Sequence, residues 1–101
     1  MSHRLKYSEQ YGTDLRLIIA YISAENPVAA RQFANTLKAK TALIAHHPEI
    51  YQLRPELGED IRIFMIFSYA IVYRISGADL LLERIVHASR DLLAILEVAE
   101  D

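Results

Sequence analysis

The chain contains no cysteine and no tryptophan, and only 3 of its 101 residues are glycine and 3 are proline. Without cysteine there is neither a disulfide framework nor a thiolate zinc site, which fits a reducing compartment. A content of 52% hydrophobic and 24% charged residues, with so little glycine and proline, excludes a disordered or low-complexity chain. We therefore expect a single packed domain over residues 1–101.

Long hydrophobic runs are also missing. No stretch reaches the roughly 18 uncharged apolar residues that a membrane span requires. The first seven residues carry His3, Arg4 and Lys6 but no apolar run follows them, so they do not resemble a secretion signal. The expectation is a cytoplasmic protein without a membrane partner.

A surplus of basic residues is absent as well. Residues 1–50 hold six Lys/Arg against four Asp/Glu, residues 51–90 hold five against five, and residues 91–101 hold none against four. Proteins that bind nucleic acid through its phosphates usually show a basic surplus, because each neutralised phosphate requires a Lys or Arg. The net charge of −2 argues against strong steering toward RNA or DNA.

Two amphipathic helices are predicted in the first half of the chain. Between residues 9 and 24 the apolar residues recur at steps of three and four: Tyr11, Leu15, Ile18, Ile19 and Ile22. This helix should end near Glu25, because Asn26-Pro27 supplies a capping side chain and a proline for the first turn of a second helix. The second helix should run from Pro27 to about His46, and a short connection makes the pair an antiparallel hairpin.

Strands are predicted at both ends of this hairpin. Residues 4–7 alternate charged and apolar side chains, which is typical of a short strand. Downstream of Pro48, four segments are rich in Ile, Val, Tyr and Phe: Ile50–Arg54, Ile61–Phe67, Tyr69–Ile75 and Leu80–His87. The last three are too closely spaced for crossovers, so they should pair antiparallel. A short helix is expected over Ser89–Asp101. The predicted fold class is α+β.

The register of these strands can be estimated from alternation. On the 61–67 segment the odd positions are all apolar (Ile61, Ile63, Met65 and Phe67), which favours them for the core. On the next strand, Ile71, Tyr73 and Ile75 should face the same side. This register places Ile63 opposite Tyr73 and Arg62 opposite Arg74, and it makes Glu83 the neighbouring acid that would offset the two like charges.

Seven short pieces in this order resemble the ParE/RelE superfamily of toxins from bacterial type II toxin–antitoxin pairs. The pieces are Asp14-Leu15 with Ile18 and Tyr21-Ile22; Asn26-Pro27 with Ala29-Ala30; Pro48-Glu49; Arg54-Pro55-Glu56-Leu57-Gly58; Ile61-Arg62; Tyr69 with Ile71 and Tyr73-Arg74; and the segment from Glu83 to Leu92. The segment His87-Ala88-Ser89-Arg90-Asp91 is more similar to the ParE branch. The resemblance implies a β-α-α-β-β-β fold, in agreement with the expected elements.

The two branches imply different functions. ParE-like members are taken to inhibit DNA gyrase without being enzymes, and RelE-like members to be ribosome-dependent mRNA endoribonucleases. For RNA cleavage the available residues are His87, as a group titrating near neutrality, with Arg62, Arg84, Arg90 or Arg74 at the phosphate. The alternative is that His87 forms local hydrogen bonds and that Arg62, Arg74 and Glu83 form a surface cluster, which is the commoner situation. The low charge favours the ParE reading, with no catalytic residues.

The resemblance also implies a cognate antitoxin as partner, in a hetero-oligomer with the toxin. A sheet covered on one side by two helices would leave Phe64, Ile66 and Val72 on an open face, beside Arg62 and Arg74, and this face is the expected antitoxin-binding surface. No metal site is expected at His46-His47 and Glu49, because adjacent helical residues do not face one another. No cofactor is expected.

Overall fold

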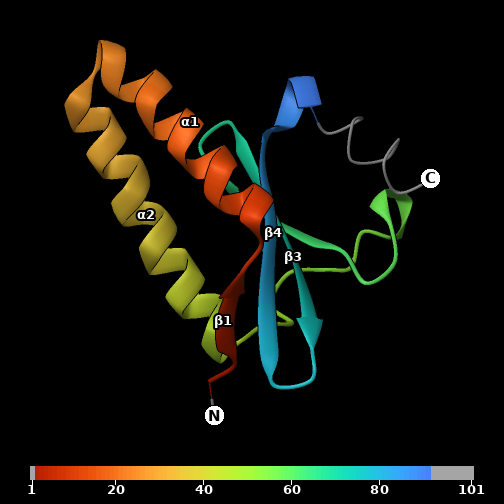
Figure 1. The fold of residues 1–101 in the computed structure, drawn as a ribbon. Coiled ribbons are helices and arrows are strands. Elements are labelled where there is room, and N and C mark those ends of the chain that lie inside the picture. Colours follow the sequence, from red (N-terminus) through yellow and green to blue (C-terminus); the bar gives the residue numbers. More distant parts are fainter. Residues whose placement is uncertain (1, 92–101) are drawn as a thin grey trace.

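The computed structural model describes residues 2–91. It places two helices against one face of a four-stranded sheet (Figure 1). The elements in chain order are β1 (Arg4–Tyr7), α1 (Glu9–Glu25), α2 (Pro27–His46), the 3-10 turn η1 (Pro55–Leu57), β2 (Arg62–Ile66), β3 (Tyr69–Ser76) and β4 (Asp79–His87). The predicted α+β class and element order are confirmed.

The helices begin and end where the sequence indicates. The Ser8 side chain accepts a hydrogen bond from the Tyr11 backbone N–H at the start of α1, and Asn26 does the same for Ala29 at the start of α2. Asn26 also closes α1, since its own N–H bonds to the carbonyl of Ile22. One residue therefore ends the first helix and caps the second, which makes the hairpin connection very short.

The sheet has the strand order β1-β4-β3-β2. β2, β3 and β4 pair antiparallel as predicted, whereas β1 pairs parallel with β4, Arg4 lying opposite Asp79 and Tyr7 opposite Leu82. The first strand of the chain thus lies beside the last one. The predicted strand at Ile50–Arg54 is wrong: that segment is a loop that makes only one bridge, between Leu53 and Arg62.

The predicted register of β2 and β3 is wrong by one residue. Ile63 lies opposite Val72 and Arg62 opposite Tyr73, so Arg62 and Arg74 do not face each other. The cause is the connection, which has two residues because Ile66 pairs with Tyr69. Phe67 takes a positive φ of 52° there, a conformation that sequence patterns assign to Gly or Asn.

The core lies between the helices and the sheet. Its buried members include Phe33 and Ile44 from α2, Phe64 and Ile66 from β2, Ile71 and Tyr73 from β3, and Leu80, Leu82 and Ile85 from β4. The expectation for β3 is confirmed, but β2 turns its even positions to the helices, while Met65 and Phe67 are exposed. Both faces of β2 are apolar, so alternation could not assign its sides.

A second, smaller cluster of buried residues lies apart from the core. It consists of Leu57, Ile61, Ile63, Ala70, Val72 and Val86. The side chain of Leu57 comes from the loop between α2 and β2, so this loop contributes to the packing. The sheet is therefore not bare on the side away from the helices.

Of the expected C-terminal helix, residues 88–91 form a first helical turn. The rest of that prediction lies outside the described residues. No helix within residues 2–91 is long and apolar enough to cross a membrane.

Candidate functional site

The expected antitoxin surface is not an exposed face. Phe64, Ile66 and Val72 are each only 1% exposed. Phe64 and Ile66 face the helices, and Val72 lies in the second cluster. The prediction that these three side chains are open to a partner is wrong, because the register shift and the 47–61 loop bury them.

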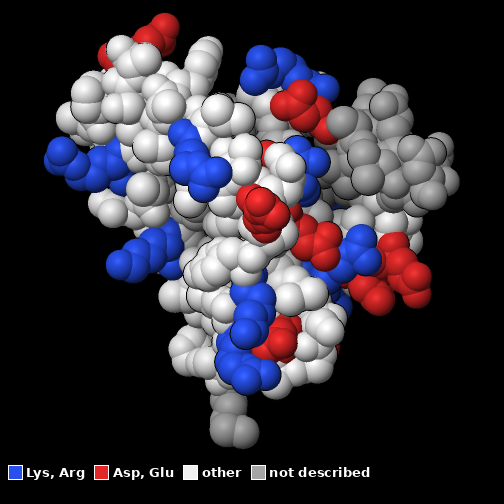
Figure 2. Space-filling model, in the orientation of Figure 1, with Lys and Arg blue, Asp and Glu red and all other residues white. Residues whose placement is uncertain are grey.

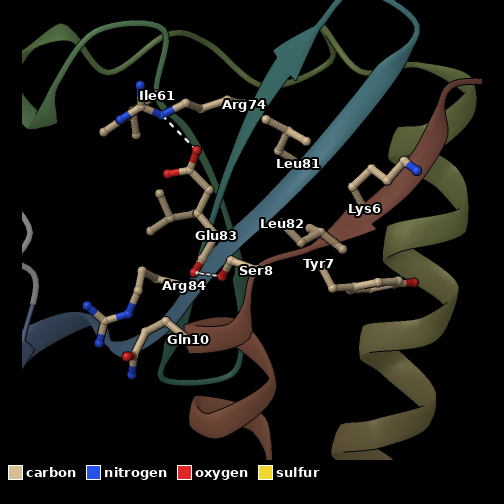
Figure 3. A pocket seen from close by; sticks show the side chains of 11 residues that line it. Lys6, Tyr7, Ser8, Gln10, Ile61, Arg74, Leu81, Leu82, Glu83 and Arg84 are labelled. Atoms are coloured by element: carbon tan, nitrogen blue, oxygen red, sulfur yellow. Dashed lines mark hydrogen bonds and ion pairs between the residues drawn. The ribbon is translucent and has the colours of Figure 1, made fainter.

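A hollow of ≈ 510 Å³ lies beside β1 and β4, at the predicted basic residues Arg74 and Arg84 (Figure 3). We call it the β1–β4 hollow. Its apolar lining comes from Tyr7, Ile61, Val72, Leu81 and Leu82, and its polar lining from Lys6, Ser8, Gln10, Arg74, Glu83 and Arg84. Of the expected antitoxin-binding residues, Arg74 and the buried Val72 line it.

Arg74 and Glu83 form an ion pair across this hollow, as predicted. Arg74 Nε lies 3.0 Å from Glu83 Oε1, and the two side chains are 37% and 31% exposed. The pairing follows from the strand register, which places Arg74 opposite Leu81 and Glu83 two residues further along β4. The Nε atom is buried. It lies near the carboxylate without the geometry of a hydrogen bond, and it forms no hydrogen bond with another described residue.

Arg84 is held by a different acid. Its Nε lies 2.9 Å from Oδ2 of Asp14, a residue of α1 that is 8% exposed. The same Oδ2 accepts a hydrogen bond of 2.9 Å from the backbone N–H of Ile85. A β-bulge between Val72 and Tyr73 accompanies this contact, so that two residues of β4, Glu83 and Arg84, lie between Leu82 and Ile85 of the core.

Asp14 therefore accepts a backbone N–H at the edge of β4, beyond the point where β1 ends. Ser8 contributes as well, since its hydroxyl donates to the Glu83 carbonyl at 2.7 Å and its N–H donates to the Leu82 carbonyl. No role for Asp14 was predicted from the sequence. The available signal was an acid on the same helical stripe as Tyr11, Leu15 and Ile18, where a buried charge needs a partner.

The residues considered for RNA cleavage each have separate contacts. Arg62 donates to the carbonyl of Tyr51 in the loop before β2. His87 ends β4, where its ring lies edge-on to Tyr69 with centroids 5.6 Å apart and its Nδ1 is 3.1 Å from Ser89 Oγ. Arg90 is exposed in the turn that follows. Among the hydrogen bonds and ion pairs of residues 2–91, none joins two of the four side chains His87, Arg62, Arg84 and Arg90.

Two tyrosines have perturbed acidities. Burial raises the pKa of Tyr73 to about 12, opposed by the nearby charge of Arg62. Its hydroxyl donates to the Pro48 carbonyl at 2.8 Å and so ties the loop after α2 to the sheet. Burial, with a further contribution from Tyr7, raises the pKa of Tyr11 well above its usual value. Both groups are protonated at neutral pH, where they serve packing rather than proton transfer.

No metal site is formed by the part of the chain that the structure describes, since no three His, Asp or Glu side chains there could share an ion. His46 instead places its ring nitrogens near Ser2 Oγ, with Nδ1 at 2.8 Å.

A helical hairpin packed on a β1-β4-β3-β2 sheet defines a small α+β protein. A chain of the chromosomal ParDE TA system from P. aeruginosa has this fold with a TM-score of 0.72 and 16% sequence identity, covering 85% of this chain and 96% of that chain. A search of curated protein sequences gave no match.

The sequence matches the family of the ParE toxin of the type II toxin–antitoxin system, parDE, over residues 5–92. The chain belongs to the ParE toxin family. The resemblance inferred from the short motifs is therefore confirmed.

Proposed function

We propose that this ParE-family toxin acts in the cytoplasm without catalysis, by binding DNA gyrase and stabilising its cleaved-DNA state, and that a cognate antitoxin neutralises it. The observation that carries the non-enzymatic part is the engagement of Arg84 by Asp14. Cleavage of RNA would need a cation that can move onto the scissile phosphate. Moving Arg84 would leave the carboxylate of Asp14 buried without its charge partner, at a cost of several kcal/mol.

The remaining residues considered for RNA cleavage support the same reading. Arg62 holds the loop before β2 through the Tyr51 carbonyl, so displacing it would release that loop. His87 is engaged with Tyr69 and Ser89. General acid–base chemistry requires such a group within hydrogen-bond reach of the substrate proton, together with a cation at the phosphate.

The test compares the two targets directly. The purified full-length toxin is added to gyrase in supercoiling and DNA-cleavage assays, where we expect inhibition and accumulation of cleaved DNA. The variant His87→Ala should be as inhibitory and as toxic to cells as the parent. Absence of gyrase inhibition at micromolar excess would contradict the proposal. Cleavage of mRNA on ribosomes that is lost in His87→Ala would instead establish the ribonuclease alternative.

We propose the β1–β4 hollow as the place where an acidic segment of the antitoxin binds. Three cations line it (Lys6, Arg74 and Arg84) against a single lining carboxylate, Glu83. Glu83 pairs with Arg74 and Asp14 pairs with Arg84, so Lys6 adds a positive charge that neither acid offsets. An antitoxin segment could pack an aliphatic side chain against Tyr7, Ile61 and Leu81 and place a carboxylate beside Arg74. It would then match both the apolar and the cationic part of the lining. Of the two arginines expected at the antitoxin surface, Arg74 lines this hollow and Arg62 lies outside its lining.

Binding to the antitoxin would be measured by titration calorimetry with Lys6→Ala and Arg74→Ala. Each should weaken the affinity by on the order of tenfold, because a partly desolvated charge pair is lost. Arg31→Ala, an exposed cation on α2, serves as the matched control and should leave the affinity unchanged. Equal effects of all three variants would place the antitoxin elsewhere.

A further inference from the structure

A cavity of ≈ 470 Å³ lies between the two helices and shares only Tyr7 with the β1–β4 hollow. We call it the α1–α2 slot. Most of its lining is apolar and comes from Leu15 and Ile19 of α1 and from Ala34 and Leu37 of α2. The Tyr7 ring lines it from β1, and Figure 3 shows this ring extending toward α2. The size of the slot is typical of a small-molecule site.

The polar groups of the slot lie at one end. The helices run antiparallel from their shared cap (Figure 1), so Tyr11 lies level with Lys38 and Thr41. Ile19 lies level with Ala34 toward the other end, nearer the hairpin connection. From Tyr11 to Ile19 the helix rises by roughly 12 Å. The slot therefore matches an elongated ligand with a polar head and an apolar chain.

Tyr11 supplies a hydrogen-bond donor at the polar end. Its side chain is only 3% exposed, and its hydroxyl forms no hydrogen bond with a described residue. Buried hydroxyl groups normally have a partner. Burial raises the pKa of Tyr11, so the hydroxyl stays protonated at neutral pH and can donate. A ligand with an acceptor atom in the slot would provide the missing partner.

The charge around the slot favours an acidic head. Among the described residues that line it, only Lys38 is charged, and this exposed side chain forms no ion pair within residues 2–91. α2 contains no acidic residue. Below the junction with α1, the surface over α2 in Figure 2 shows basic groups and no acidic one. A negative group at the opening would be attracted and a positive group repelled.

Gly12 leaves room for such a ligand. It lies in the interior of α1, where glycine weakens a helix. Apart from its own helix backbone, a Cβ atom at this position would meet one described atom within 4 Å, Arg16 Nη1 at 3.6 Å. This is an ordinary van der Waals contact, so the packing of the protein does not require a glycine here. The missing side chain instead widens the polar end of the slot.

We propose that the α1–α2 slot binds a medium-chain carboxylate, such as a free fatty acid of the length of decanoate. The hydrocarbon chain lies along Leu15, Ile19 and Leu37. The carboxylate accepts the hydrogen bond of the Tyr11 hydroxyl and pairs with Lys38. This inference concerns a ligand of the toxin and does not rest on the proposed target.

The first test is calorimetric titration of the full-length protein with sodium decanoate below its micelle concentration, where we expect one-to-one binding. Decyltrimethylammonium has the same chain with a positive head and should bind at least tenfold more weakly. Lys38→Ala should weaken the binding of decanoate roughly tenfold. Arg31→Ala removes an exposed cation of α2 that does not line the slot, and as the matched control it should leave the affinity unchanged.

The second test separates binding from folding. Tyr11→Phe keeps the ring and should weaken decanoate binding severalfold without lowering the melting temperature, because the hydroxyl has no protein partner to lose. Gly12→Leu places a side chain in the slot and should weaken binding more than tenfold. Leucine favours a helix over glycine, so the melting temperature of this variant should not fall. A variant that merely misfolds would lose both affinity and melting temperature.

Three outcomes would overturn the proposal. The first is no binding of decanoate, as expected if a side chain of the antitoxin fills the slot instead. The second is equal affinity for the two amphiphiles, which would show that the charge of the head is not recognised. The third is binding that Gly12→Leu leaves unchanged, which would place the ligand elsewhere on the protein.

Discussion

Asp14 on α1 and Arg84 on β4 form an ion pair of 2.9 Å between residues 70 positions apart in the sequence. The same carboxylate accepts the backbone N–H of Ile85, so it satisfies a main-chain donor that β1 is too short to reach. The pair thereby joins α1 to β4 just beyond the point where β1 ends. Its residues are structural, and Arg74 is paired with Glu83, so Lys6 is the cation of the β1–β4 hollow that forms no ion pair with a described residue.

Replacing Asp14 by alanine should lower the free energy of unfolding by about 2–3 kcal/mol, because the Ile85 N–H is left unpaired and Arg84 loses its partner. Urea unfolding followed by circular dichroism measures the change. Asp14→Asn retains an oxygen for the Ile85 N–H and should cost less than the alanine variant. If Asn and Ala were equally destabilising, the hydrogen bond to Ile85 would contribute nothing.

Tyr73 should make the protein sensitive to alkali. Its pKa is 10.0 when unfolded and about 12 when folded, so the unfolded chain loses this proton first as the pH rises. The contribution of Tyr73 to the free energy of unfolding is therefore fully present below pH 10 and is lost progressively between pH 10 and about 12. Tyr73→Phe should be about 1 kcal/mol less stable at neutral pH, since the bond to the Pro48 carbonyl is gone, but should lose less stability on going to alkaline pH.

The control is Tyr21→Phe, because Tyr21 is 70% exposed. Its unfolding free energy should follow the parent protein at every pH. Tyr11, whose pKa is also raised, will leave part of the alkaline loss in the Tyr73→Phe variant. An unchanged pH profile in that variant would show that Tyr73 titrates alike in both states.

Phe67 holds a backbone conformation that costs energy. It has a φ of 52° although it is a bulky residue, and its side chain is 67% exposed. Phe67→Gly should raise the free energy of unfolding by about 1 kcal/mol relative to Phe67→Ala, because both lose the ring contact with Phe33 and only glycine relieves the strain. Thermal unfolding of the two variants compares them directly, and equal stability would argue against strain.

Phe64→Ala should lower the free energy of unfolding by about 3–5 kcal/mol, as expected for a buried aromatic side chain. Phe64 is 1% exposed and contacts Tyr51 and Tyr73, with ring centroids 5.8 and 5.9 Å apart. Met65→Ala, the matched neighbour at 42% exposure, should cost well under 1 kcal/mol. Chemical denaturation measures the unfolding free energy of both variants. A small effect at Phe64 would show that its side chain is exposed, as the sequence had predicted.

The sequence predicted the helices closely because their signals are local. The Asn26-Pro27 pair marks both the end of α1 and the beginning of α2, and α2 has the predicted limits Pro27 and His46. The Arg74–Glu83 pair was also predictable, since a short turn at residues 76–79 fixes which residues of β3 and β4 are neighbours.

The sides of β2 were not predictable in the same way. Its register depends on whether the β2–β3 connection has two or three residues, and this in turn depends on the positive φ of Phe67, which no local pattern indicates. The contact of Asp14 with Ile85 depends on β1 ending at Tyr7, a tertiary feature. The lining of the β1–β4 hollow depends on both the register of β2 and the end of β1. It could therefore not be predicted from the sequence.

The parallel pairing of β1 with β4 has a consequence for synthesis of the toxin. Arg4 and its partner Asp79 are 75 residues apart, and the strand that completes the sheet ends at His87. A nascent chain on the ribosome cannot assemble this sheet until almost all of its described residues have emerged. Folding is then governed by slow, non-local contacts, so a fragment released early by an interrupted ribosome would lack the complete sheet.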